Sequence, residues 1–207
     1  MDTFERWLRA LGGLASIGTL TLALLGILES IRRPSGRVEP GARLALRAPV
    51  LLGATILFLS VGALLWRPLP LRVPPQWGAG VPLFGALVFF PSLGLYLWGL
   101  KSLGEMFGPS SGLGVRLHAH HHLVTAGPYA LVRHPMYLGV IGAGIGALFL
   151  YRTWATLAFA FTMLGLVFRA RREEKVLHEE FGPEWEAYAS HVPAWLPRFG
   201  ARRASGA

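Results

Sequence analysis

The chain has 207 residues, of which 53% are apolar and only 15% charged, and its formal net charge is +9. This composition excludes an ordinary soluble domain and indicates an integral membrane protein. The positive charge is spread over loops beside apolar runs, which favours membrane lipids with anionic headgroups, and not nucleic acid, as the partner. Because the sequence contains no cysteine, disulfides, thiolate metal sites and cysteine nucleophiles are excluded.

Five apolar runs are candidates for membrane-spanning helices, because crossing a bilayer core of ~30 Å takes ~20 mostly apolar helical residues. In chain order they are residues 11–28, 48–66, 81–100, 137–150 and 154–168. The last two are short for full spans and only three residues separate them, so we predict a tight helical hairpin. The expected fold class is therefore an all-α membrane protein with about five transmembrane helices and a helical C-terminal tail.

Lys and Arg are unevenly divided between the two sides that five spans create. Segments 31–47 and 101–136 and the tail from residue 169 hold 15 of the 20 basic residues. Since cytoplasmic loops are enriched in Lys and Arg, we expect these segments, the tail and any site on them to be cytoplasmic. Only two of the 20 are Lys, a bias that resembles GC-rich bacterial genomes, so the bacterial inner membrane is the expected location.

The chemistry-bearing residues are concentrated in the second half of the chain. Residues 1–100 are predicted to be a scaffold of three transmembrane helices. Residues 101–207 combine a polar loop, the predicted hairpin and a charged tail. We expect this half to be the catalytic one.

A polar stretch precedes the fourth apolar run. Pro135 is well suited to the first position of a helix, where its missing N–H costs nothing, and it should hold His134 extended. Arg133 and His134 would then lie at a helix N-terminus, where free N–H groups and the helix dipole favour an anionic group. Arg133 is thus a candidate for binding a substrate, the alternative being an anchor at headgroup level.

Arg169 and Glu173 follow the last apolar run and are four positions apart. A continuing helix places both on one face, as a structural ion pair or as two walls of a polar pocket. A basic cluster after a span explains the arginines of this region, but not its glutamates.

Two further patterns are assigned to structure and not to chemistry. The four histidines at positions 118, 120, 121 and 122 are adjacent or nearly so and lack an interleaved carboxylate, so we interpret them as a His-rich loop and expect no metal site. The glycine-rich run 142–147 lacks the strand and the acidic residue of a dinucleotide-binding motif. Small residues at a close helix–helix contact explain it better.

Several motifs occur in a specific order around the predicted hairpin. They are Leu-Val-Thr-Ala-Gly-Pro-Tyr at 123–129, Arg-His-Pro-Met-Tyr-Leu-Gly at 133–139, Arg-x-x-x-Glu-Glu at 169–174, Phe-Gly-Pro-Glu-Trp-x-x-Tyr at 181–188 and Val-Pro-x-Trp-Leu-Pro at 192–197. In order and spacing, over about residues 120–200, the chain resembles the isoprenylcysteine carboxyl methyltransferase and phospholipid methyltransferase superfamily of integral membrane enzymes. The resemblance implies methyl transfer from S-adenosylmethionine, held in a cytoplasmic pocket of the C-terminal half, to a lipophilic or small acceptor.

The resemblance also implies roles for individual residues, by position. The implied cofactor contacts are His121, His122, Leu123, Val124, Tyr129, His134, Pro135, Met136, Tyr137 and Glu173. Arg169 is implied to lie near the acceptor. Arg169 and Glu173 are accordingly the expected catalytic pair, and Arg169 with Arg133 the expected acceptor-binding residues.

Two other classes of function remain open on the sequence. One is a non-catalytic membrane protein, a transporter subunit or scaffold whose Arg, His and Glu groups stabilise helix ends. The other is an integral-membrane reductase of sterol type, which would bind a nicotinamide cofactor. The methyl acceptor is also open between a carboxylate, an amine and a thiol, on a lipid or a small molecule, as is the oligomeric state.

Overall fold

The computed structural model describes residues 3–32, 48–71, 73–107 and 122–197, and these ranges are all-helical apart from connecting segments and one isolated bridge between Pro68 and Thr153. The α-helices are α1 (Thr3–Arg32), α3 (Ala48–Leu64), α4 (Gly80–Leu103), α5 (Pro135–Tyr151), α6 (Trp154–Met163), α7 (Leu166–Phe181) and α8 (Pro183–His191). The short 3-10 helices are η1 (Pro75–Trp77), η2 (Gly104–Met106) and η4 (Gly127–Ala130). The predicted all-α class is confirmed for the described residues.

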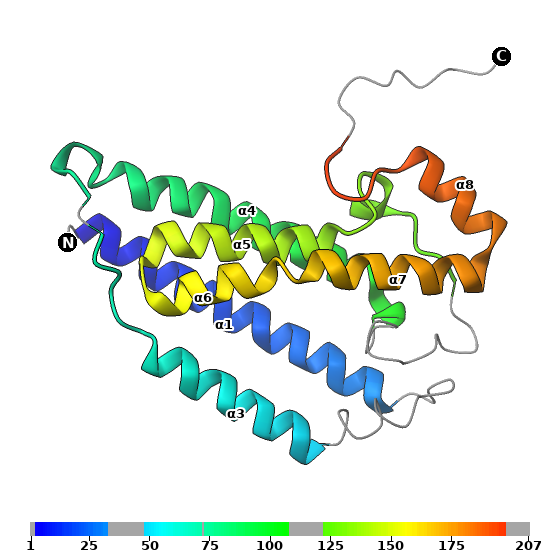
Figure 1. Ribbon diagram of the computed structural model, residues 1–207, viewed down its shortest axis with the longest axis horizontal. Helices are drawn as coiled ribbons and strands as arrows, with labels where there is room; N and C mark the ends of the chain where they lie inside the picture. The colour runs from blue at the N-terminus through cyan, green and yellow to red at the C-terminus, as the bar shows by residue number, and fades with distance from the viewer. Residues whose placement is uncertain (1–2, 33–47, 72, 108–121, 198–207) are drawn as a thin grey trace.

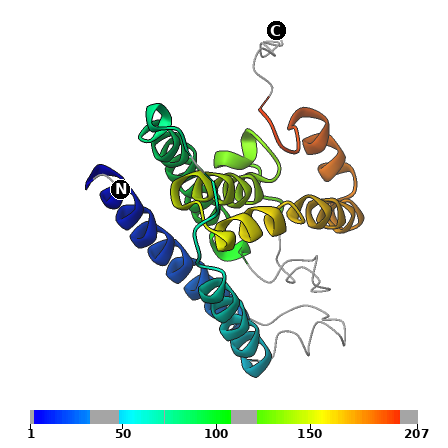
Figure 2. The same ribbon diagram turned by 60° about the vertical axis from the view of Figure 1, so that its left-hand side comes forward.

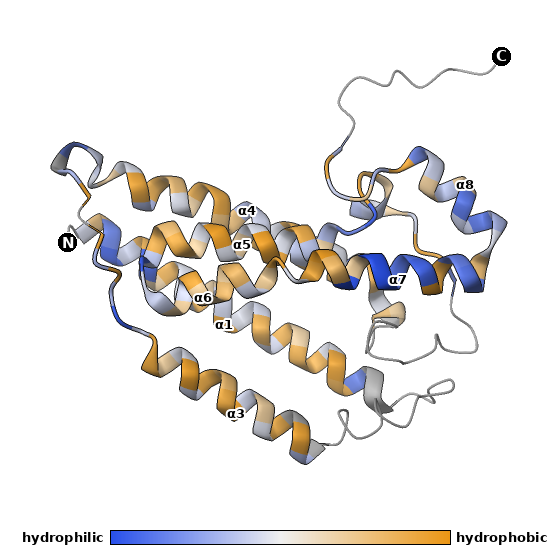
Figure 3. Ribbon diagram, in the orientation of Figure 1, coloured by the Kyte–Doolittle hydropathy of each residue, from blue (hydrophilic) through white to orange (hydrophobic). Residues whose placement is uncertain are grey.

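The helices form a bundle with one polar end. α4 and α5 lie side by side, and α6 returns along α5 (Figures 1 and 2). α7 continues in the direction of α6 beyond the start of α5, where α8 folds back over it (Figure 1). Colouring by hydropathy shows that α7 and α8 carry most of the hydrophilic residues, whereas α1 and α3 to α6 are largely apolar (Figure 3).

Glycines bring the backbones of α4 and α5 into direct contact. A Cβ added to Gly146 would lie 2.5 Å from the backbone nitrogen of Phe89, and one added to Gly85 would lie 2.6 Å from that of Leu150. On another side of α5, a Cβ on Gly144 would lie 3.2 Å from the Cα atom of Ala160 in α6. The prediction that the glycine-rich run 142–147 lines close helix contacts is confirmed.

The predicted hairpin forms at the end of α5. Arg152 adopts the left-handed conformation with φ of 54°, which reverses the chain. Thr153 then caps α6, because its side-chain oxygen accepts the backbone N–H of Thr156 at 3.2 Å while the Thr156 hydroxyl accepts the N–H of Thr153. α5 and α6 are therefore joined by two residues and run antiparallel.

The second helix of the hairpin is shorter than expected. The apolar run 154–168 predicts one helix, but α6 ends at Met163 and α7 begins at Leu166. At the break, Leu164 and Gly165 donate to the carbonyls of Phe161 and Thr162, three residues back, so the chain tightens for one turn. Glycine has the lowest helix propensity of any residue but proline, which favours a break at this place.

Within the described residues, two helical segments are long and apolar enough to cross a membrane, Thr3–Glu29 and Gly80–Leu103. The apolar parts of α3 and α5 are shorter than this criterion requires, and the count of five spans stays a prediction. Both α1 and α3 expose many large apolar side chains, among them Leu14, Leu57 and Leu64 at 65–70% exposure. Apolar surface of this extent indicates a bilayer or a protein partner around these helices.

The start of α1 is tied to the tip of the hairpin by a cluster of charged residues. The Glu5 carboxylate, 8% exposed, accepts a hydrogen bond from Nη2 of Arg9 at 2.6 Å and another from Arg152. The Tyr151 hydroxyl donates to the backbone carbonyl of Arg9 at 2.7 Å. This cluster lies at the end of the bundle opposite to α7 and α8 (Figure 1).

The division into a scaffold (1–100) and a catalytic half (101–207) stays a prediction.

Candidate active site

The start of α5 is the centre of the polar end of the bundle. Pro135 is the first residue of α5, as predicted, and it is fully buried. His134 precedes it with φ of −121° and ψ of 55°, so the expected extended conformation is not reached in ψ. The cause is that the His134 carbonyl already accepts the first helical hydrogen bond, from the N–H of Leu138 at 3.0 Å.

The guanidinium of Arg133 joins three elements around this helix start. Its Nε and Nη2 atoms lie 2.9 and 2.8 Å from Oε1 of Glu174 in α7. Its Nη1 atom donates to the carbonyls of Ala189 and Val192, at the end of α8, at 3.0 and 2.8 Å. The group also lies over the ring of Trp185 at 5.7 Å. Arg133 thus holds α7 and α8 against the start of α5.

The imidazole of His134 is enclosed by two aromatic rings. It stacks on Tyr137 with 5.6 Å between ring centroids and 9° between planes, and Trp195 lies 5.3 Å away at 33°. Its Nε2 atom is 3.0 Å from Oε1 of Glu174. With its side chain 5% exposed, the ring is fixed in position and orientation.

A chain of hydrogen bonds runs from α7 to α5 and back. The Tyr137 hydroxyl donates to Oε2 of Glu173 at 2.7 Å and accepts from Nε of Arg169 at 3.2 Å. The predicted helix places Arg169 and Glu173 on one face, and this hydroxyl joins them. An arginine, a phenol and a carboxylate are therefore brought together at the first turn of α5.

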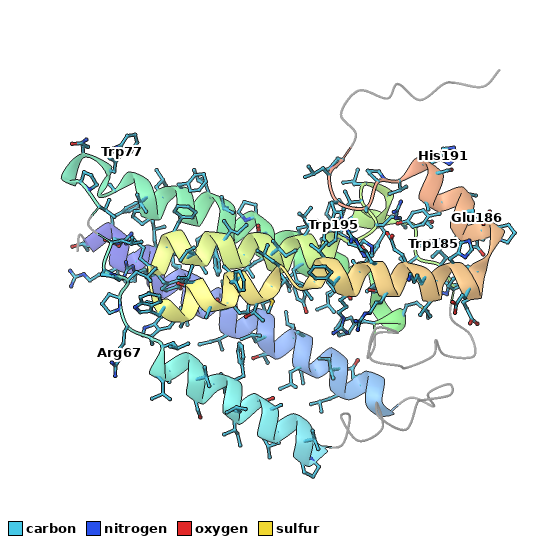
Figure 4. The ribbon with its side chains drawn as sticks, viewed as in Figure 1. Arg67, Trp77, Trp185, Glu186, His191 and Trp195 are labelled. Atoms are coloured by element: carbon cyan, nitrogen blue, oxygen red, sulfur yellow. The ribbon has the colours of Figure 1, made fainter. Side chains whose placement is uncertain are left out.

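The segment after α8 forms one wall of this end. The carbonyls of Pro193 and Ala194 accept the backbone N–H groups of Arg133 and His134 at 2.9 and 3.2 Å. These bonds satisfy donors that a helix start leaves unpaired. Trp195 lies on this segment beside the start of α5, while Trp185 lies between α8 and α7 (Figure 4).

The environment keeps Glu174 ionised and the neighbouring tyrosines neutral. Hydrogen bonds from His134, and then from Arg133, lower the pKa of the Glu174 carboxyl below its usual value. Burial raises the pKa of Tyr188 to about 12 and raises that of Tyr129 as well. The Tyr188 hydroxyl is therefore a donor, and it bonds the carbonyl of Tyr129 at 2.7 Å. This bond holds η4 against α8.

Of the other expected site residues, Tyr129 is held by Tyr188 of α8, while His121 is outside the described residues together with His118 and His120. His122 is exposed, and Leu123 and Val124 are half-buried in the segment leading to η4. Met136 packs against Gly99 of α4, because a Cβ added to Gly99 would lie 2.6 Å from the Cγ atom of Met136. Among the residues that the structure describes, no group of three His, Asp or Glu side chains is placed to hold a metal ion.

Among the residues that contact this centre, Glu174, Trp185, Tyr188 and Trp195 had no role in the sequence prediction. Each belongs to a motif that the sequence displays, but the motif alone does not say what its members contact. The sequence feature that could have pointed to Glu174 is the charge of Arg133, because an arginine at a buried helix start requires an acidic partner. Glu173 and Glu174 were the nearest candidates, and the structure gives Arg133 the second of them.

This arrangement provides complementary groups for a zwitterionic or cationic ligand. Glu173 offers a carboxylate to a cation, Arg169 offers a guanidinium to an anion, and aromatic rings favour a cation placed over their faces. It contains no cysteine, and a displacement that binds two reactants side by side requires no covalent nucleophile.

The curated relatives of this chain include proteins named as methyltransferases and one named for metal resistance. A protein-S-isoprenylcysteine O-methyltransferase B of Arabidopsis thaliana is 32% identical over 130 residues, covering 54% of this chain and 66% of the relative. A methanethiol S-methyltransferase 2 of Bradyrhizobium diazoefficiens is 31% identical over 172 residues, covering 74% and 60%. A cobalt-zinc-cadmium resistance protein of Cupriavidus metallidurans is 34% identical over 116 residues, covering 54% and 51%. The chain thus spans between half and two thirds of the length of these relatives.

The phospholipid methyltransferase family matches residues 81–184. This range begins upstream of the motifs found in the sequence and includes all but the first residue of α4, together with η4, α5, α6 and α7. It contains the whole chain of hydrogen bonds through Tyr137, as well as the tie between Arg133 and Glu174. The match extends over half of the chain and shows that this protein belongs to the phospholipid methyltransferase family.

Proposed function

We propose that the protein is a membrane methyltransferase that uses S-adenosylmethionine. The observation that carries the proposal is the convergence of His134, Tyr137, Arg169 and Glu173 at the start of α5, inside the segment that the family matches. The comparisons do not favour the two alternatives, a transporter or scaffold subunit and a sterol-type reductase.

The donor set at this site fits the chemical character of the cofactor. S-adenosylmethionine carries an ammonium group, a carboxylate and a sulfonium cation, and it supplies the methyl group from the sulfonium. Glu173 is suited to an ammonium group or a ribose hydroxyl, and N–H groups of the first turn of α5 are suited to a carboxylate. The rings around His134 are suited to the sulfonium.

We assign the remaining cofactor contacts by position in the family motifs. His121, His122, Leu123 and Val124 form one stretch, Tyr129 a further contact, and Pro135 and Met136 accompany His134 and Tyr137 at the helix mouth. The burial of Tyr129 and Pro135 supports a role for them in shaping the wall of the pocket. Excluding water and fixing the reactants within attack distance are the main requirements of an in-line methyl transfer.

Arg169 is the residue that we assign to the acceptor. Its guanidinium would pair directly with a carboxylate acceptor. A neutral amine or thiol acceptor offers no anion to this guanidinium until the acceptor is deprotonated. For such an acceptor a general base matters more. We assign that task to Glu173, whose connection to Arg169 through Tyr137 supports the assignment. We keep a contact between Arg133 and the acceptor as a prediction, beside the bonds of its guanidinium to Glu174, Ala189 and Val192.

We also propose that the protein spans the bacterial inner membrane, with α7, α8 and the site on the cytoplasmic side. The concentration of Lys and Arg on the side of the C-terminal tail supports this orientation. The apolar surface of α1 and α3 supports burial of these helices in lipid. A bacterial setting makes a prenylated cysteine the least expected acceptor.

Incubation of the purified protein with S-adenosylmethionine labelled in its methyl group, together with total lipid or thiol extracts, tests this proposal. We expect label to appear in an extractable product, whose identification separates carboxylate, amine and thiol acceptors. A parallel assay of hydride transfer from nicotinamide cofactors tests the reductase. Hydride transfer without methyl transfer would overturn the proposal.

A further inference from the structure

The two adjacent glutamates of α7 have different partners. Glu173 accepts from the Tyr137 hydroxyl, whereas Oε1 of Glu174 lies 2.9 and 2.8 Å from two nitrogens of Arg133 and 3.0 Å from Nε2 of His134. Neighbours in a helix point about 100° apart, which is why the pair divides between the two contacts. Glu174 has no role in the chemistry proposed above.

The bond to Glu174 determines which nitrogen of His134 carries its proton. An ionised carboxylate only accepts hydrogen bonds, so Nε2 of His134 must be the protonated nitrogen. In a neutral imidazole the other nitrogen, Nδ1, then has a free lone pair and acts as an acceptor. The low pKa of Glu174 supports this assignment, because the carboxyl stays ionised at neutral pH.

The direction of that lone pair is also fixed. The ring is held between Tyr137 and Trp195, and its side chain is only 5% exposed. The backbone on either side is constrained as well, since the N–H of His134 bonds the carbonyl of Ala194 and its carbonyl bonds the N–H of Leu138. Nδ1 of His134 is therefore a preorganised acceptor.

We propose that Glu174 is a positioning residue for cofactor binding that acts through His134. It holds the imidazole in the Nε2–H form, so that Nδ1 accepts a hydrogen bond from an N–H or O–H group of the methyl donor. This inference rests on the proposed use of S-adenosylmethionine. It separates the two glutamates into one that faces the ligand, Glu173, and one that orients a neighbouring group.

A double-mutant cycle between Glu174→Met and His134→Ala tests the proposal, with the dissociation constant of S-adenosylmethionine as the measurement. Glu174→Met keeps the side-chain length and removes the acceptor, and should weaken binding by about tenfold, the effect of one hydrogen bond to a charged group. In the His134→Ala background the same change should have no further effect. Glu174→Gln keeps an acceptor oxygen and should restore most of the affinity. The matched control is Glu180→Met, an exposed position on the same helix.

A second measurement does not depend on the cofactor. In protein labelled with ¹⁵N at histidine, the spectrum of the free protein reports the protonated nitrogen of His134. We expect the Nε2–H form alone in the wild type and in Glu174→Gln, and a mixture of both forms in Glu174→Met. Should Glu174→Met not fold, Glu174→Asp, which withdraws the carboxylate by one methylene, takes its place in both measurements.

Full additivity of Glu174→Met and His134→Ala, or wild-type affinity in Glu174→Met, would overturn the positioning role. A protonated Nδ1 in the free wild-type protein would overturn it as well. If the wild type does not bind S-adenosylmethionine, the proposed function fails. In that case the ¹⁵N spectrum still decides whether Glu174 fixes the ring.

Discussion

Replacing Gly146 by alanine perturbs the contact that aligns α4 with α5. A Cβ at this position would lie 2.5 and 2.7 Å from the backbone nitrogen and Cα of Phe89, and 2.8 Å from the carbonyl oxygen of Gly85. All three are backbone atoms, so no side-chain rotation can relieve the overlap. Reaching an ordinary contact of about 3.5 Å requires the two helices to separate by roughly 1 Å.

The expected cost follows from this geometry. Overpacking of a well-packed core typically costs about 1–3 kcal/mol, and the better helix propensity of alanine returns up to about 1 kcal/mol. The net destabilisation should be about 1–2 kcal/mol, which for a chain of this size lowers the melting temperature by about 2–8 °C. The matched control is Gly94→Ala in α4, where an added Cβ meets nothing within 4 Å; it should be neutral or stabilising.

Thermal unfolding of the detergent-purified variants, followed by tryptophan fluorescence, measures the difference. Because Met136 of the site packs against Gly99 in the same helix pair, Gly146→Ala should also weaken ligand binding. A Gly146→Ala variant that melts at or above the temperature of Gly94→Ala would refute the close packing of α4 on α5.

Three further predictions concern the polar contacts. Glu5→Gln removes a charge that pairs with two arginines, on a side chain that is 11% exposed. It should lower the free energy of unfolding by about 3 kcal/mol, measured by thermal unfolding. Unchanged stability would contradict the tie between α1 and the hairpin. The folded-state pKa of Glu174 lies below its usual 4.5, so the ionised carboxylate stabilises the fold above pH 4.5 and this stabilisation is lost as the pH falls further. Below pH 4.5 the melting temperature should therefore drop less steeply in Glu174→Gln than in the wild type. Parallel curves of melting temperature against pH would contradict this prediction. Tyr137→Phe removes the hydroxyl that joins Arg169 to Glu173. It should reduce kcat/KM about tenfold or more, with little change in melting temperature. Undiminished turnover would exclude a role for this hydroxyl.

The elements of the fold follow from local sequence signals. Apolar runs predict most of the helices, and Pro135 predicts the start of α5 at the correct residue. The break after Met163 escapes the hydropathy pattern, because neither Leu164 nor Gly165 is charged or strongly polar. What differs there is backbone propensity and a single turn of tighter hydrogen bonds, and neither changes the hydropathy profile.

The site is less accessible to sequence reasoning, because its contacts join distant segments. The spacing of Arg169 and Glu173 predicts a shared face, but it does not predict that a hydroxyl from α5, more than 30 positions away, joins them. Likewise Arg133 and His134 reach Glu174 only because α7 continues past the start of α5 (Figure 1). Choosing between two adjacent glutamates requires the rotation of α7 about its axis, which packing determines.

Binding of S-adenosylmethionine to the purified protein, measured by titration calorimetry together with thermal shift, tests the central claim most directly. We predict saturable heat and a raised melting temperature in the wild type and in the exposed control Glu180→Gln. Affinity should be at least tenfold weaker in Glu173→Gln and in His134→Ala. No heat and no thermal shift with the cofactor in the folded wild-type protein would contradict the account.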